Sequence, residues 1–306
     1  MKQLIRILNI FIILLFQSCF TGIESTPKIT LKKNYDEYST EISDEKKFLS
    51  HIKNQPFKHW LKGKEFYVTS DKIALIFSAN CSTDSLSGST IRYEGYTTAT
   101  SVTGDYSTDI IFSDTNNNIF TYRVNCSPKE LNERENIDIP FTIQTSIIED
   151  VNQLLLNKTF YILTSSWYDL KHNSIAGKKY IPVTISKIEA GNHIYPINIT
   201  FTDDQNQTHC VYMTVGNEIQ STRNFNTLFS FNDPRNKYPT ITDENWDKIV
   251  NQSTTIGMTK NECKLALGIP VSVQQYPSNA GVIELWIYEN GNRLFFEDGI
   301  LKEFKQ

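Results

Sequence analysis

The sequence predicts a mostly β protein that ends in an α+β domain. Its 306 residues include 15 Tyr and 18 Phe, and aromatic residues of this kind are typical of strands. Short runs of alternating apolar and polar residues, closed by turn residues, fill the middle of the chain. Helical spacing follows near the C-terminus, before a last group of strands. We therefore expect two small β-barrel or sandwich units, followed by two helices and a three-stranded antiparallel sheet.

Length and charge exclude several classes of protein. Apolar residues make up 39% of the chain, which is too many for a disordered protein. The formal net charge is −4 and there is no basic run, so we expect no nucleic-acid partner. At roughly 100–200 residues per domain, the length predicts two or three domains.

The N-terminus has the pattern of a signal peptide, which we assign to residues 1–18. The apolar run Ile7–Phe16 follows a short basic region and is too short to span a membrane. Cys19 comes directly after it, and Leu15–Cys19 resembles the lipobox of bacterial lipoproteins. An ordinary secretory signal, in which Cys19 is incidental, is the alternative.

The lipobox resemblance implies a location in the cell and a membrane anchor. It implies that Cys19 carries acyl chains and becomes the first residue of the mature protein; two or more chains anchor stably in a bilayer. Phe20 in place of Asp after this cysteine implies the outer membrane, on its periplasmic or its surface face. The remainder of 19–55 is polar with mixed charges, which predicts a tether.

Two stretches of the middle region are similar to each other. Residues 63–68 match 157–162, and residues 106–114 match 195–203 in the same order. In each copy, polar loops of about five residues separate alternating runs, which is a hairpin signal. We expect β-rich units at 56–145 and 146–238, which look like the SH3-like repeats of bacterial envelope proteins. Duplication and chance similarity of short β motifs both remain open.

Two helices are predicted from local signals at the start of the C-terminal domain, 239–306. Thr242 is an N-cap candidate for a helix with Trp246 and Ile249 on its buried face. Thr259 and Glu262 form a capping box for a second helix near 260–267. Gly268 suits the left-handed position that ends such a helix.

Three strands are predicted to follow, joined by Asn-Gly and Asp-Gly turns. If both loops have two residues, Ile287 lies opposite Leu294 and Phe296 lies opposite Leu301. One face would then be apolar and cover the helices. The opposite face would carry aromatic and basic side chains: Trp286, Tyr288, Arg293, Phe295, Lys302 and Phe304.

The C-terminal sequence resembles a known family. The string 257–270, with the core G-M-T-x-x-E-x-x-x-x-L-G-x-P, and the strands around Trp286 and Phe296 are similar to the SmpA/OmlA family. That family includes a lipoprotein of the outer-membrane β-barrel assembly machinery and shares its fold with β-lactamase-inhibitor repeats. Cys263 stands where valine is usual in the family. The resemblance implies a fold and a compartment for about a fifth of the chain.

The cysteines suggest one disulfide. Cys81 and Cys126 both end apolar strands in a chain expected to reach an oxidising compartment. If those strands are neighbours, a disulfide between them would stabilise the fold by roughly 3–4 kcal/mol. Cys263 is interpreted as a buried structural thiol and Cys210 as a strand residue, and a disulfide between these two is the alternative.

No catalytic or metal-binding pattern stands out. The five histidines have no H-x-x-x-H spacing, and the chain has neither a G-x-S-x-G elbow nor a phosphate loop. Asp203 and Asp204 are interpreted as a turn. We expect a non-enzymatic envelope lipoprotein without a cofactor, acting as a binding or scaffold module. The alternatives are an inhibitor or sensor that binds an envelope protein or a glycan, and a cell-wall or glycan hydrolase.

The aromatic–basic face of the last sheet is the candidate interaction surface. Its residue types are those of protein-binding hot spots, so the expected partner is another envelope protein. The alternative is that this face docks internally on the preceding β unit, through residues 233–235 and Tyr238. Alanine substitutions at Trp286 and Phe295 separate the two interpretations. Only internal docking predicts a large loss of stability, whereas a partner surface predicts a nearly unchanged melting temperature.

Overall fold

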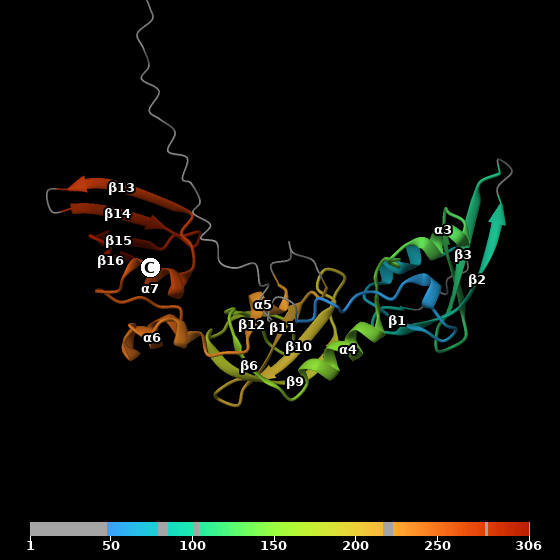
Figure 1. Ribbon diagram of the computed structural model, residues 1–306, viewed down its shortest axis with the longest axis horizontal. Helices are drawn as coiled ribbons and strands as arrows, with labels where there is room; N and C mark the ends of the chain where they lie inside the picture. The colour runs from blue at the N-terminus through green and yellow to red at the C-terminus, as the bar shows by residue number, and fades with distance from the viewer. Residues whose placement is uncertain (1–47, 79–84, 101–103, 217–222, 279–280, 306) are drawn as a thin grey trace, which may run out of the picture. The chain divides into compact units, whose positions relative to one another are not determined.

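The computed structural model describes residues 48–78, 85–100, 104–216, 223–278 and 281–305. These residues form three antiparallel sheets of five, seven and four strands, each labelled in Figure 1. Each sheet has its own cluster of buried apolar side chains. The prediction of a mostly β chain is confirmed. The signal peptide, Cys19 and Cys81 lie outside the described residues.

The first sheet has the strand order β4-β3-β2-β1-β5. Its strands are β1 (Glu65–Val68), β2 (Thr90–Thr100), β3 (Tyr106–Ser113), β4 (Ile119–Val124) and β5 (Thr142–Gln144). Its helical elements are η1 (Phe57–His59), η2 (Asp71–Leu75) and α3 (Pro128–Glu133). Alternate residues of the strands, among them Phe66, Ile110 and Phe112, point into one aromatic-rich core.

The second sheet has the order β12-β6-β9-β10-β11-β7-β8. Its strands are β6 (Thr159–Ile162), β7 (Ser166–Tyr168), β8 (Ser174–Ala176), β9 (Ile181–Ala190), β10 (Ile197–Thr202), β11 (Thr208–Met213) and β12 (Phe229–Ser230). Helix α4 (Thr145–Leu155) precedes it, and α5 (Phe225–Leu228) precedes β12. Leu49 and Ile52 are buried in the core of this sheet, so the last residues of the segment predicted as a tether are folded.

The two sheets share a five-strand arrangement. The order β4-β3-β2-β1-β5 in the first corresponds to β11-β10-β9-β6-β12 in the second. A β-bulge occurs at the same place in both sheets. Glu94 is the extra, unpaired residue of β2 beside β3, and Ser186 is the extra, unpaired residue of β9 beside β10. Gly63 and Asn157, each just before the first strand, both have a positive φ, of 90° and 61°.

The matching hairpins also close with the same turn. The carboxylate of Asp114 accepts a hydrogen bond from the backbone N–H of Asn118, and that of Asp203 accepts one from Gln207, both at 2.8 Å. These aspartates occupy the corresponding ends of β3 and β10. The hairpin of β7 and β8 uses the same turn at Asp169. The aspartate pair at 203–204 is thus part of a turn, as predicted.

The C-terminal domain begins with η3 (Pro234–Lys237), α6 (Asp243–Val250) and α7 (Lys260–Leu267). The predicted cap of α6 is confirmed, since the Thr242 hydroxyl accepts from the N–H of Asn245 at 3.2 Å. The capping box of α7 is confirmed in both directions between Thr259 and Glu262. Gly268 ends α7 with a φ of 85°.

The C-terminal sheet has four strands where three were predicted. They are β13 (Ser272–Ser278), β14 (Gly281–Ile287), β15 (Arg293–Glu297) and β16 (Ile300–Lys305), in that order across the sheet (Figure 1). The turn at Asp298 and Gly299 has two residues as predicted, and Phe296 pairs with Leu301. The missed strand is β13.

The predicted pairing of β14 with β15 is wrong by one residue. Tyr288 donates its backbone N–H to the carbonyl of Asn292 at 2.9 Å, so the loop between them has three residues instead of two. Trp286 therefore lies opposite Leu294, a position predicted for Ile287. Because successive side chains of a strand point to opposite faces, this shift exchanges the two faces of β14.

Candidate interaction surface

The register of β14 overturns part of the predicted surface. Trp286 and Tyr288 are buried against the helices, with exposed fractions of 2% and 7%. Arg293 and Phe295 lie on the face away from the helices, as predicted. Phe304 lies opposite the buried Leu294, on the helix side, at the open end of the sheet.

Lys302 lies at a bulge in β16. It is the extra residue where the pairing of β15 with β16 shifts between Phe295 and Phe296. Such a bulge leaves its residue outside the regular alternation of the strand. Lys302 is exposed but does not belong to a continuous face with Phe295.

Polar contacts hold Trp286 in its buried position. Its indole N–H donates to the carboxylate of Glu284 at 3.0 Å, and Lys260 donates to the same carboxylate at 2.8 Å. The hydrogen bond from Lys260 is the largest influence that lowers the pKa of Glu284. The ring of Trp286 packs on Phe296, with 4.6 Å between centroids, and the ammonium of Lys264 lies over it. A charged residue thus occupies the helix side of β14 because it is paired there.

The face away from the helices is called the outer face from here on. Cα pairing arranges its side chains in three rows across the four strands. The first row, from β13 to β16, holds Ser272, Ile287, Arg293 and Lys305. The second row holds Gln274, Leu285, Phe295 and Glu303. The third row holds Tyr276, Ile283, Glu297 and Ile300.

The centre of the outer face is apolar. Ile283, Leu285 and Ile287 fill the whole length of β14, and Phe295 lies beside them on β15. All four are partly exposed, and no helix of the C-terminal domain covers this side. The charges are confined to β15 and β16. An apolar centre with charges along one side is the arrangement of a protein-binding surface.

The aliphatic part of this surface was missed from the sequence. The isoleucines and the leucine of β14 were expected to cover the helices, because aliphatic residues are more often buried than a Glu-Trp-Tyr series. The signal that could have corrected this is the loop, Glu289-Asn290-Gly291. Gly291 has a φ of 87°, which also suits the last position of a three-residue hairpin loop.

The internal docking contacts that were considered do not involve the outer face. Tyr238 packs its ring near Trp246 of α6, at 6.2 Å between centroids, and the guanidinium of Arg235 lies over the same ring at 5.8 Å. Both contacts are therefore on the helical side of the domain.

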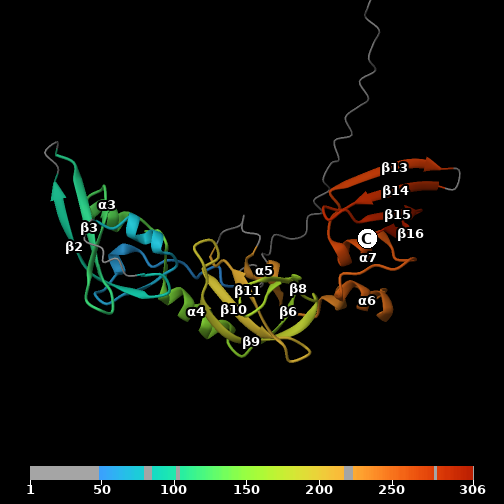
Figure 2. The same ribbon diagram turned by 180° about the vertical axis from the view of Figure 1, so that it is seen from behind.

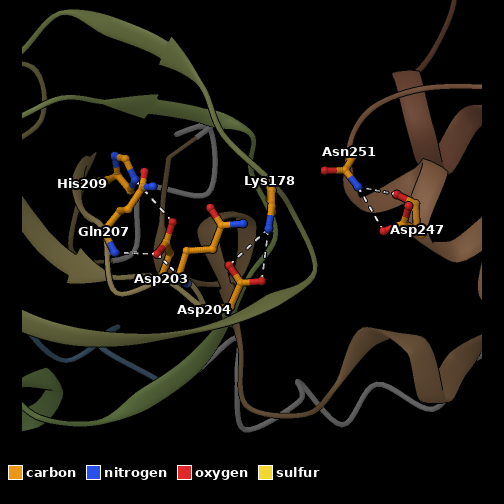
Figure 3. A network of polar contacts seen from close by, with 8 residues as sticks. Lys178, Asp203, Asp204, Gln207, His209, Asp247 and Asn251 are labelled. Carbon is orange, nitrogen blue, oxygen red and sulfur yellow. Dashed lines mark hydrogen bonds and ion pairs between the residues drawn. The ribbon is translucent and has the colours of Figure 1, made fainter.

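Other candidate groups in the described part of the chain form structural contacts. The second carboxylate oxygen of Asp203 lies 3.4 Å from Nε2 of His209, and Lys178 pairs with Asp204 at 3.2 Å (Figure 3). No group of three His, Cys, Asp or Glu side chains among these residues could hold a metal ion.

Two buried thiols, Cys210 and Cys263, have raised pKa values, and Sγ of Cys210 lies 4.0 Å from Nδ1 of His172. Burial raises the pKa of Cys210, and it raises the pKa of Cys263 to about 12, so both are protonated at neutral pH. Cys126 is also buried, whereas its predicted disulfide partner Cys81 lies outside the described residues.

A cleft of about 810 Å³ lies in the C-terminal domain between α7 and the segment with Tyr238 and Ile241. The one carboxylate among its lining residues is that of Glu262. This carboxylate accepts hydrogen bonds from Thr259 and from Asn245. The cleft thus does not hold the two carboxylates that a glycoside hydrolase would place there.

No family model, curated protein or solved structure matches the chain. In the described ranges, no helix is long and apolar enough to cross a membrane.

Proposed function

We propose that this protein is a non-enzymatic lipoprotein of the outer membrane that binds another envelope protein through the outer face of its C-terminal sheet. The observation that carries the proposal is that Ile283, Leu285 and Ile287 lie uncovered along β14, beside Phe295 on β15. The membrane anchor at Cys19 and the compartment rest on the lipobox resemblance alone.

The energetics of this face favour a protein partner. Covering a partly exposed aliphatic or aromatic side chain contributes up to about 1 kcal/mol by area. Four adjacent side chains of this kind can therefore supply the centre of an interface. Arg293 and Lys305 at one end of the outer face, and Glu297 and Glu303 further along it, would fix the orientation of the partner.

The two β-rich units are proposed to be copies of one module, similar to SH3-like repeats. The shared strand order, the bulges at Glu94 and Ser186, and the turns at Asp114 and Asp203 support this proposal.

Site-directed photo-crosslinking in intact cells tests the function. A photoreactive side chain in place of Leu285 should give a defined crosslinked product that mass spectrometry identifies as an envelope protein. The matched control replaces Thr121, which lies on the solvent face of the first sheet, and should give no such product. Equal labelling from both positions, or none from Leu285, would refute the proposed surface.

The anchor has an independent test. Labelled palmitate should be incorporated into the wild-type chain and lost in the Cys19→Ser variant. Incorporation that persists in the variant, or none in the wild type, would contradict the anchor while leaving the crosslinking result untouched.

A further inference from the structure

Five of the six outermost strands in the described sheets are protected from pairing with another chain. Strands β5, β8 and β12 have only three, three and two residues. Strand β4 is covered by an isolated bridge between Tyr122 and Phe77. Short or covered edges are the usual means by which proteins avoid edge-to-edge association.

Strand β16 is protected twice. The segment before α7 lies along it, since Leu301 exchanges backbone hydrogen bonds with Gly257 and Met258 at 2.9 and 2.8 Å. Beyond this segment, three of its last four residues are charged: Lys302, Glu303 and Lys305.

Strand β13, at the opposite edge, has neither protection. It is seven residues long, contains no charged residue, and lies outermost in both views of the fold (Figures 1 and 2). Within the ranges that the structure describes, its backbone has no hydrogen-bond partner on the side away from β14. It is the one long, uncharged and uncovered outermost strand there.

The sheet register shows which backbone groups are open. Tyr288 bonds to β15 through its N–H, so even-numbered residues of β14 face β15 and odd-numbered ones face β13. Leu285 pairs with Gln274, which places the backbone groups of Gln274 toward β14. The N–H and C=O groups of Val273 and Gln275 therefore point outward.

We propose that β13 pairs antiparallel with β13 of a second copy of this chain, about a two-fold axis at Gln274. Val273 of each copy then exchanges two backbone hydrogen bonds with Gln275 of the other, four bonds in all. The axis is perpendicular to the sheet, so the outer faces of the two copies join on the same side of an eight-stranded sheet.

Pro277 selects this register. It has no N–H, and in the pairing about Gln274 it lies opposite Val271, whose own N–H is already bonded to Ile287 at 2.9 Å. No free donor is therefore left without an acceptor. A shift of the axis by one residue, to Gln275, places Pro277 opposite Val273 and leaves the carbonyl of Val273 without a donor.

The side chains of β13 and of Val271, the residue just before it, are self-complementary in this arrangement. Val271, before the strand, is 66% exposed, and Tyr276, near its end, is 49% exposed. Antiparallel pairing covers both ends, because it brings Val271 onto Pro277 and Tyr276 onto Ser272 of the other copy. The absence of charge on β13 leaves no repulsion between the copies. An isologous contact of this kind closes into a dimer.

Strand pairing alone buries less than the roughly 1,600 Å² of a standard stable interface, so the dimer should depend on concentration. Light scattering of the purified full chain over a concentration series should show the mass rise from one chain to two. In a Gln274→Lys variant, two positively charged side chains would lie directly opposite each other, with Cβ atoms about 5 Å apart across the axis, and the mass should stay at one chain.

Ser272→Lys is the matched control for charge on the same strand and face. It lies opposite Tyr276 in the proposed register, so its dimer should persist. Both variants should melt near the wild-type temperature, because both positions face solvent. A wild-type mass of one chain at every concentration, or equal dimerisation of the Gln274→Lys variant, would overturn the proposal.

A thiol on the axis tests the register. In a Gln274→Cys variant the two Cα atoms would lie about 4.5 Å apart, within the range that a disulfide bridges, and oxidation should link two chains at this position. In Ser272→Cys the two thiols are separated by about four residues of strand, roughly 13 Å, and should not link. A link from Ser272→Cys but not from Gln274→Cys would refute the pairing. Crosslinking of a partner from Leu285 is a separate readout, so either proposal can fail alone.

Discussion

The first sheet and the C-terminal sheet each bury one face, but their solvent faces differ. On the first sheet, Arg92 pairs with Glu65 at 3.0 Å and Arg123 pairs with Asp109 at 2.7 Å across neighbouring strands. On the C-terminal sheet, the equivalent central positions hold aliphatic side chains, and Leu285 lies beside Phe295.

This difference separates a solvated face from the face that we propose binds a partner. A sheet with one solvated face is expected to alternate apolar and polar residues, as the first sheet does. Strand β14 reverses that rule, since Glu284 points toward the helices and aliphatic residues point away from them. The helix side tolerates Glu284 because Lys260 and Trp286 bond to it. The C-terminal domain thus keeps its apolar outer face while its core remains satisfied.

The largest expected effect concerns which face of β14 is structural. Trp286→Ala should destabilise the protein by about 3–5 kcal/mol, because it empties a packed site and removes a hydrogen bond to Glu284. Phe295→Ala should cost about 1 kcal/mol or less, since that ring is partly exposed. Urea unfolding monitored by circular dichroism measures both. Similar losses for the two variants would break the distinction between the faces.

The local part of the C-terminal domain could be predicted from sequence, and the packing-dependent part could not. The caps at Thr242 and Thr259 and the turn at Gly299 involve residues within a few positions, so their patterns determine them. The register of β14 follows from a three-residue loop, but Asn290-Gly291 also suits a two-residue loop, and the pairing with Lys260 that favours the observed register lies 24 residues earlier than Glu284. No local pattern links those two residues.

The missed strand and the misplaced surface have the same origin. Strand β13 reads Ser-Val-Gln-Gln-Tyr-Pro-Ser, which shows no clear alternation and contains a proline. Proline is tolerated at Pro277 because its nitrogen faces the open edge, a fact visible only once the sheet is assembled. In the candidate surface, Arg293 and Phe295 lie on the predicted face because the orientation of β15 was predicted correctly, whereas the bulge at Lys302 moves Phe304 to the helix side.

The second prediction concerns a variant that should lose its partner but keep most of its stability. A Leu285→Ser, Phe295→Ser double variant should lose the crosslinked partner while unfolding within about 2 kcal/mol of wild type. The reason is that both side chains contact mainly their neighbours on the outer face. The control is Thr121→Ala on the first sheet, which should keep the partner. Crosslinking from an unchanged outer-face position such as Ile283 gives the readout, and full retention of the product in the double variant would contradict the proposed surface.

The smallest effect tests the solvated face by pH. A hydrogen bond from Arg123 is the main cause that lowers the pKa of Asp109 below its usual value. A carboxyl with a lowered folded-state pKa adds stability above its unfolded pKa, near 3.9, and loses it as the pH falls through the folded value. Asp109→Asn should therefore lower stability at pH 7 and have little effect at the acid end. Because Arg123 is 60% exposed, the difference at pH 7 should be about 1 kcal/mol or less. Urea midpoints at several pH values measure this difference. A difference that stays constant down to pH 2 would show that Asp109 acts through packing. The solvent face of the first sheet would then be less solvated than its ion pairs indicate.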